Sequence, residues 1–218
     1  AACVRLEGFY RTAAGESLAR HITRVEVFAG RPFANVTHTL VVTNDTNKVW
    51  FREVGWELAV VPGAEAKGLF NVDRADPSAT LIRALSGASS VHMLQDEQVR
   101  FGAGRNHFAV GTGSGELLHE GGECGDWGML AGREGALFVG CDEAARQHPK
   151  VLELFANRVI LKLFSGRAGE ALYFRPEALA RKWDLKGELA ERVLKVETNA
   201  AGWSKTHELL FAALAPAG

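Results

Sequence analysis

The sequence predicts an all-β protein, a large antiparallel β-sandwich with one or two short helices. One observation is the segment 22–43, which reads as two strands joined by a tight turn at 30–32. In its first half Val25 and Val27 alternate with charged residues, the period of two expected of a half-buried strand. The other observation is that about fifteen short segments of this kind recur along the chain, separated by turn residues.

The second half of this hairpin has two chemically different faces. Val36, His38 and Leu40 alternate with Asn and Thr residues, so His38 shares a face with two apolar residues and a structural role is the alternative to a functional one. We expect one face of the hairpin to carry Arg, His and Thr side chains, with Arg24 and His38 facing each other. A wide antiparallel sheet with a polar face suits a protein that handles carbohydrate, and it does not fit a nucleotide-binding fold.

The same patterns predict the other elements in order. Gly15, Asn44-Asp45, Pro62-Gly63, Gly121-Gly122 and Gly132 mark turns between them. A helix is expected at 142–147, with Asp142 as its N-cap, and another at 177–184, after Pro176. Residues 63–80 are expected to form a long loop. Strands are expected at 3–11, 19–28, 33–43, 50–61, 80–85, 90–95, 106–110, 115–119, 126–131, 135–141, 151–156, 158–164, 171–174, 192–198 and 203–214.

Length and charge narrow the function classes. A chain of 218 residues can bury a large core as a single β-sandwich domain, residues 1–218. Its 25 basic and 26 acidic residues give a formal net charge of −1, which argues against nucleic acid or an anionic membrane as the main partner. No apolar run approaches the ~20 residues that span a bilayer. Because Ala1 leads directly into a strand without Met, we expect a domain excised from a longer multidomain protein.

The cysteines leave the compartment open. Cys3, Cys124 and Cys141 are odd in number and lack zinc-site spacing, so a disulfide framework is not expected, although one pair remains possible. Asn35 and Asn44 each begin an N-glycosylation pattern, for which a chance match is the stronger interpretation. Extracellular and cytoplasmic locations both remain open.

Two loops carry residue types associated with ligands. Residues 111–115 are rich in glycine, but the Lys of a phosphate-binding P-loop is missing after them, so a flexible hairpin loop is expected. Residues 119–126 combine His, Glu, Cys and Asp without a standard zinc spacing, so no metal or other cofactor is expected. The adjacent pair Asp126 and Trp127 offers a carboxylate and an indole suited to a sugar, while a buried Trp127 in the core is the alternative.

The last strand carries a third candidate. In a strand, Lys205 and His207 share one face, whereas Ser204, Thr206 and Glu208 share the other. A Lys and a His on one face can neutralise a carboxylate and move a proton. The alternative is a solvated edge strand with polar residues on its outer face.

Several segments together resemble a known family. The resemblance lies in the order of the segments 8–11, 24–30, 38–45, 126–127, 147–150 and 205–208. In this order they resemble the central β-sandwich domain, a supersandwich-like fold, of exo-rhamnogalacturonan lyase-like proteins, over residues 3–61 and 124–214. In those proteins a small β-barrel precedes the sandwich and an α/α-toroid follows it.

The resemblance implies a polysaccharide lyase architecture that acts on rhamnogalacturonan or pectin. Such a lyase neutralises the carboxylate of a uronate, removes the C5 proton with a base and assists departure of O4 with an acid. The candidates for neutralisation are Arg24 and Lys205, and those for proton transfer are His38, His207 and Tyr10. Tyr10 is also a candidate for sugar binding, with Asp126 and Trp127.

The active cleft of such enzymes lies between domains, so this chain is expected to supply scaffold or one wall of the cleft and to be inactive alone. The expected partners are a polysaccharide or oligosaccharide and the neighbouring domains of the parent protein. Two alternatives remain open, a non-catalytic carbohydrate-binding module and a sandwich used only for packing between domains. Exposed aromatic side chains on one sheet favour the former, and a large apolar patch without a neighbour favours a scaffold or packing role.

Overall fold

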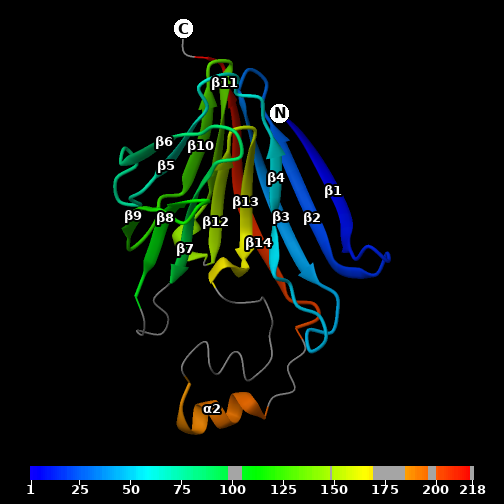
Figure 1. The fold of residues 1–218 in the computed structure, drawn as a ribbon. Helices are drawn as coiled ribbons and strands as arrows, with labels where there is room; N and C mark the ends of the chain where they lie inside the picture. The colour runs from blue at the N-terminus through cyan, green and yellow to red at the C-terminus, as the bar shows by residue number, and fades with distance from the viewer. Residues whose placement is uncertain (98–104, 148, 169–184, 196–199, 217–218) are drawn as a thin grey trace.

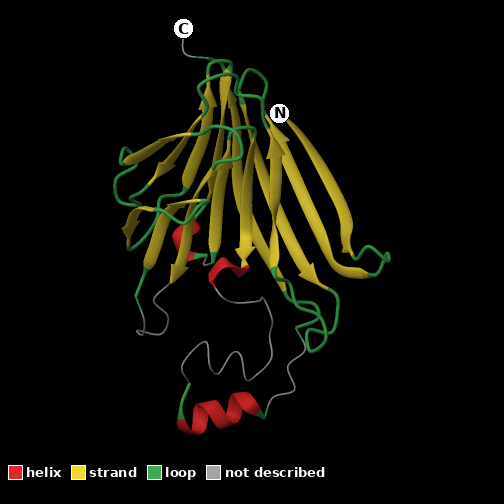
Figure 2. Cartoon of the chain, in the orientation of Figure 1, coloured by secondary structure: helices red, strands yellow, loops and turns green. Residues whose placement is uncertain are grey.

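Two antiparallel sheets packed face to face form the protein in the computed structural model, which describes residues 1–97, 105–147, 149–168, 185–195 and 200–216 (Figures 1 and 2). The larger sheet has eight strands in the order β1-β2-β3-β14-β11-β10-β5-β6, and the smaller has six in the order β4-β13-β12-β7-β8-β9. This confirms the predicted large antiparallel β-sandwich.

The strands of the larger sheet are β1 (Ala2–Arg11), β2 (Ser17–Val27), β3 (Phe33–Val42), β5 (Lys67–Asn71), β6 (Thr80–Ala84), β10 (Trp127–Gly132), β11 (Gly135–Cys141) and β14 (Ser204–Leu214). Those of the smaller sheet are β4 (Glu53–Ala59), β7 (Ser90–Glu97), β8 (His107–Thr112), β9 (Leu117–Gly121), β12 (Lys150–Phe155) and β13 (Arg158–Ser165). Two 3₁₀ turns, η1 (Ala144–Arg146) and η2 (Gly166–Ala168), and the helix α2 (Gly187–Leu194) complete the described elements.

The hydrophobic core lies between the two sheets. It is built from alternate residues of facing strands, of which Phe70, Phe108, Leu130 and Leu154 are almost fully buried. Period-two alternation turns these side chains inward because successive residues of a strand point to opposite faces.

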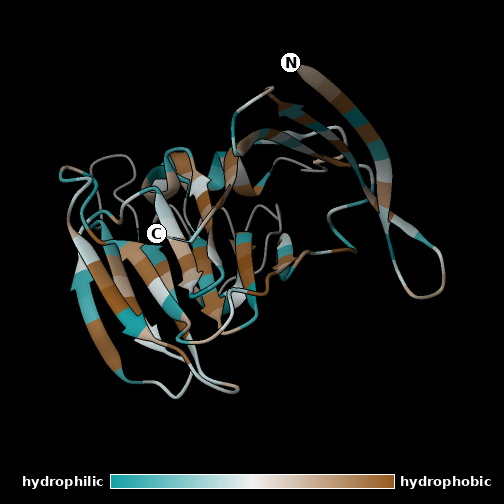
Figure 3. Cartoon of the chain, turned by 90° about the horizontal axis from the view of Figure 1, so that it is seen from above, coloured by the Kyte–Doolittle hydropathy of each residue, from teal (hydrophilic) through white to brown (hydrophobic). Residues whose placement is uncertain are grey.

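The larger sheet extends beyond the smaller one at its N-terminal edge. Val4, Leu6 and Val27 share the inner face of the β1–β2 ribbon because β1 and β2 pair Val4 with Val25 and Leu6 with Thr23. These three apolar side chains nevertheless remain 44–52% exposed. The smaller sheet ends at β4, and in Figure 3 the N-terminal ribbon projects past the rest of the sandwich. We call this exposed inner face, formed by Val4, Leu6 and Val27, the underside of the ribbon.

Three predictions of local structure are wrong. Residues 63–80 contain β5, which the sequence analysis expected to be loop, and Phe70 of this strand is fully buried. The segment 192–198 was expected to be a strand, but residues up to Leu194 belong to α2, where Ala, Leu, Glu and Arg favour helix. The N-cap position before η1 is occupied by Glu143, which has the left-handed conformation with φ of 50°, so Asp142 is not the N-cap. The strand expected at 171–174 and the helix at 177–184 lie outside the described residues.

Candidate functional site

Strand pairing gathers several of the predicted site residues on the inner face of the larger sheet. Thr23 of β2, His38 of β3 and His207 of β14 stand opposite one another in a single cross-strand row. In the next row His21, Leu40 and Lys205 are aligned in the same way. Because directly paired residues of an antiparallel sheet share a face, these side chains form one polar band under the ribbon.

His38 is the centre of a hydrogen-bond chain. Its Nε2 lies 3.0 Å from the hydroxyl oxygen of Tyr10, and its Nδ1 lies 2.8 Å from Oγ1 of Thr23. Oγ1 of Thr23 lies in turn 3.4 Å from Nδ1 of His21. One consistent set of donors runs through all four groups: Tyr10 donates to His38, His38 donates to Thr23, and Thr23 donates to His21.

Aromatic rings surround this chain. The rings of His21 and His38 are stacked with centroids 5.9 Å apart, and Trp56 of β4 meets His38 edge-on at 5.5 Å. Gly8 makes this packing possible, because a Cβ at that position would lie 2.7 Å from Nε2 of His21. His38 is buried, whereas Tyr10 and His21 are half-buried and form the outer boundary of the cluster.

The electrostatics of the cluster favour neutral side chains. Burial, reinforced by nearby His21, lowers the pKa of His38 to about 4. Burial also raises the pKa of Tyr10 above its ordinary value. At neutral pH the cluster therefore holds a neutral imidazole and a protonated phenol, joined by a hydrogen bond.

His207 continues the polar band into the interior. Its Nδ1 lies 2.8 Å from Oε1 of Gln147, whose own Nε2 donates to the carbonyl of Asp142. Burial, with a smaller contribution from the charge of Lys150, lowers the pKa of His207 to about 2. The side chain is only 6% exposed. His207 is thus a neutral, hydrogen-bonded group of the interior.

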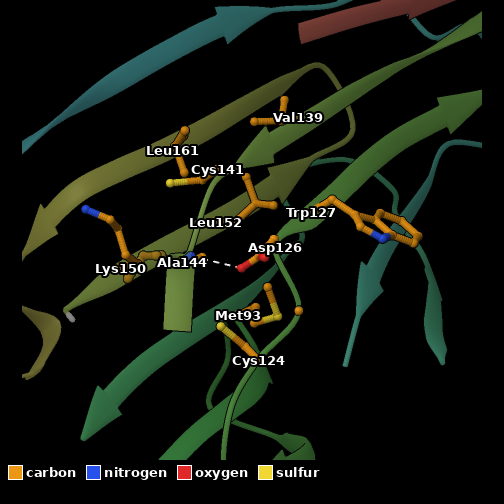
Figure 4. Close-up of a pocket in the computed structure, with 12 residues that line it drawn as sticks. Met93, Cys124, Asp126, Trp127, Val139, Cys141, Ala144, Lys150, Leu152 and Leu161 are labelled. Carbon is orange, nitrogen blue, oxygen red and sulfur yellow. Dashed lines mark hydrogen bonds between the residues drawn. The ribbon is translucent and has the colours of Figure 1, made fainter. Parts of the chain in front are cut away.

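Lys150 is a buried amine that sequence reasoning did not single out. Its Nζ donates to the carbonyl of Leu163 at 2.5 Å and lies 3.1 Å from Nδ1 of His207. No carboxylate among the described residues pairs with it, and burial lowers its pKa to about 8. Lys150 also lines a small cavity of about 20 Å³ between the sheets, together with Cys124, Cys141 and Asp126 (Figure 4). This volume is enough for one water molecule.

Three predicted site residues lie away from the band. Arg24 is exposed on the outer face of the larger sheet, opposite Thr37, so the expectation that it faces His38 is wrong. A carboxylate oxygen of Asp126 accepts a hydrogen bond from the backbone N–H of Ala144 at 2.9 Å and so holds η1, as the dashed line in Figure 4 shows. Burial raises the pKa of Asp126.

Trp127 is not a core residue. In Figure 4 its ring points away from the cavity, and it stacks on Phe138 with the centroids 5.6 Å apart and the planes inclined by 29°. Both rings belong to the outer face of the larger sheet, since Gly128 and Leu130 occupy the inner positions of the same strand. This pair is half-buried.

The two ligand-like loops have structural roles. The glycine-rich segment 111–115 joins β8 to β9 as a hairpin turn, in agreement with the prediction. In the segment 119–126, which contains the end of β9 and the loop after it, Glu123 is bonded to Arg74 and Asn106, and Cys124 is buried. No group of three or more metal-ligand side chains capable of holding an ion is found within the described ranges. The cysteines of the chain are free thiols.

The site includes residues that the sequence analysis missed: His21, Thr23, Trp56, Gln147 and Lys150. Thr23 and His21 lie in the same strand as Arg24, so the period-two pattern could have identified them as the inward set. No local signal places Lys150 or Gln147 beside His207, because they are about 60 residues away along the chain.

Comparisons with known proteins give no family for this chain. No family model matches it, and no curated protein matches it. Among the described helices, none is long and apolar enough to cross a membrane.

Proposed function

We propose that this chain is the β-sandwich domain of a polysaccharide lyase-like protein that acts on a rhamnogalacturonan or pectin-type substrate. In this role it provides scaffold and one wall of the substrate cleft. The observation that carries the proposal is the exposed apolar underside of the ribbon, with the Tyr10–His38–Thr23–His21 chain directly beside it. An apolar surface of this kind needs a covering neighbour, and a polar cluster at its border lies where two domains would enclose a saccharide.

Two groups of the band match two of the three roles in β-elimination, and the base that takes the C5 proton is supplied by the facing wall of the cleft in this proposal. Lys205 carries a positive charge on the same face as His207 and can neutralise a uronate carboxylate. The hydroxyl of Tyr10 can donate its proton to the departing O4 when the chain of donors runs in the reverse direction, so that Nε2–H of His38 donates to the Tyr10 oxygen and holds it in position. Tyr10, half-buried at the border of the band, offers an aromatic ring against which the apolar side of a sugar can pack.

Two of the earlier candidates fit this reaction poorly. Arg24 lies on the opposite face of the sheet from Lys205, and His207 is too deeply buried to meet a polysaccharide directly. We assign His207 to positioning the sheet and the Lys205 strand. Because the remaining groups form one wall, the isolated chain is expected to fold without turning over substrate.

The experiment compares the full-length parent protein with its Tyr10→Phe variant by the ultraviolet absorbance of the unsaturated uronate product. Loss of the hydroxyl should reduce kcat at least tenfold while the melting temperature changes little, because the ring and its packing remain. Phe9→Leu, one residue away on the outer face, is the matched control and should keep full turnover. Unchanged turnover in Tyr10→Phe, or no uronate lyase activity in the parent, would contradict the proposal.

A non-catalytic carbohydrate-binding module is the second candidate. The observation that favours it is the Trp127–Phe138 pair, whose stacked rings lie on the outer face of the larger sheet. Adjacent aromatic rings on an open sheet face are suited to packing against sugar rings. Titration of the isolated chain with pectic oligosaccharides tests this role. Saturable binding that Trp127→Ala removes and Leu117→Ala retains would favour the binding module.

A further inference from the structure

The N-terminal ribbon ends in an open strand edge. Strand β1 is ten residues long and lies at one end of the larger sheet, with β2 as its single neighbour within the described part of the chain. Its free edge therefore presents a row of backbone N–H and C=O groups to which another strand can pair. Figure 1 shows β1 at the margin of the molecule.

The two faces of β1 differ in chemistry. Val4 and Leu6 lie on the inner face and are 52% and 51% exposed. Arg5 and Glu7 lie on the outer face, where Glu7 forms ion pairs with Arg5 and with Arg20. A partner strand must therefore offer apolar side chains on one face and alternating charges on the other.

We infer that this partner is the β1 strand of a second copy of the chain, paired antiparallel about a two-fold axis at Leu6. With the axis there, Leu6 stands opposite Leu6 of the second copy and Val4 stands opposite Gly8. On the outer face Arg5 meets Glu7 of the second copy, and the symmetry repeats this pair. The pairing opposes residues 2–10 of both copies and joins the two undersides into one apolar surface.

Charge selects this register over its neighbours. If the two-fold axis lay at Arg5, the Arg5 side chains of the two copies would stand opposite each other. If the axis lay at Glu7, the two Glu7 side chains would stand opposite each other. Like charges directly opposite in a sheet are destabilising, whereas opposite charges stabilise. Directly opposed residues of two antiparallel strands point to the same face of the sheet. Even-numbered residues of β1 lie on the inner face and odd-numbered residues on the outer face, so a register that opposes an even-numbered residue to an odd-numbered one is excluded.

The test measures self-association of the full chain by analytical ultracentrifugation. Glu7→Arg places Arg opposite Arg5 twice in each dimer and should weaken association about tenfold or more. Arg5→Glu should weaken it similarly, and the double variant Arg5→Glu/Glu7→Arg should restore it. Glu26→Arg is the matched control, since it reverses a charge on the same outer face one strand away from the edge. Thermal melting confirms that each variant is folded.

A distance measurement checks the register. Cys3 is the exposed cysteine and the other two are buried, so a spin label attaches to it selectively. In the proposed register the two Cys3 Cα atoms lie on the order of 20 Å apart, at about 3.4 Å per residue along the strands. A chain that is monomeric at about 100 µM, or a dimer that ignores both charge reversals, would overturn the inference.

Discussion

Titration of His38 should make the stability of the fold depend on pH between about 4 and 6.5. His38 is 2% exposed, and both of its ring nitrogens are engaged, by Tyr10 and by Thr23. We propose to compare the wild-type chain with His38→Gln, which keeps a polar side chain in the cluster but cannot take up a proton. The quantity of interest is the pH dependence of the free energy of unfolding.

The magnitude follows from the difference between the two states. Burial lowers the pKa of His38 from 6.5 to about 4 in the folded protein. Above pH 6.5 the imidazole is neutral in both states and contributes no pH dependence. As the pH falls from 6.5 towards 4, the unfolded chain takes up a proton that the folded chain does not. The free energy of unfolding should then fall by about 1.4 kcal/mol per pH unit, or ~3 kcal/mol in total.

Urea unfolding followed by circular dichroism at intervals from pH 7.5 to 4 measures this dependence. Other buried groups, such as His207 with its lowered pKa, contribute equally to both proteins and cancel in the comparison. His38→Gln should be less stable at pH 7 by ~1–3 kcal/mol because it loses hydrogen bonds of the cluster. Its free energy of unfolding should nevertheless fall less steeply as the pH decreases. The difference in slope should correspond to uptake of about one proton, or about 1.4 kcal/mol per pH unit.

An equal slope in the two proteins would refute the reasoning. It would mean that His38 binds a proton in the folded state as readily as in the unfolded one. A steeper slope in the variant would contradict it as well, since the substitution removes a titrating group and adds none.

Three further outcomes are expected. Lys150→Met should leave stability unchanged or raise it in a thermal melt, because it replaces a buried amine that has no carboxylate partner within the described ranges by an apolar side chain of similar length. Gly55→Ala should lower stability by ~1–3 kcal/mol in urea unfolding, since its Cβ would lie 2.4 Å from the carbonyl oxygen of Leu161; an unchanged midpoint would contradict the close approach. Asp126→Ala should cost ~1 kcal/mol in urea unfolding by leaving the N–H of Ala144 without its acceptor, and Asp126→Asn should recover most of this.

The local sequence pattern was sufficient to predict a strand where the alternation of its own residues is clear. Alternation of apolar and polar residues located β3 and placed His38 on the apolar face with Val36 and Leu40, as the structure confirms. Pattern failed at β5, where the segment is short and its glycine weakens the strand signal. It failed at α2 because the segment 192–198 is short. Over so few residues the spacing of the apolar residues is compatible with the period of two of a strand and with the 3.6-residue period of a helix.

The candidate site was only partly predictable for the same reason. Its members on β3 and β14 were identified as single residues, but the contacts that give them their properties join distant strands. Lys150 and His207, whose Nζ and Nδ1 atoms lie 3.1 Å apart, are 57 residues apart in sequence. Alternation shows which residues share a face of one strand, and it carries no information on which strand lies alongside.

The sequence by itself determined the all-β class, the antiparallel sandwich and the inward direction of His38, because the period-two alternation of a strand is a local property. Only the tertiary structure decided that β14 lies beside β3, that Lys150 reaches His207 from the opposite sheet, and that β1 and β2 extend past the smaller sheet. Val4 and Leu6 follow the alternation of core-facing residues, yet they are exposed because no strand of the smaller sheet lies beneath them among the described residues. Burial depends on what the rest of the chain places opposite a side chain, and that is settled by long-range packing.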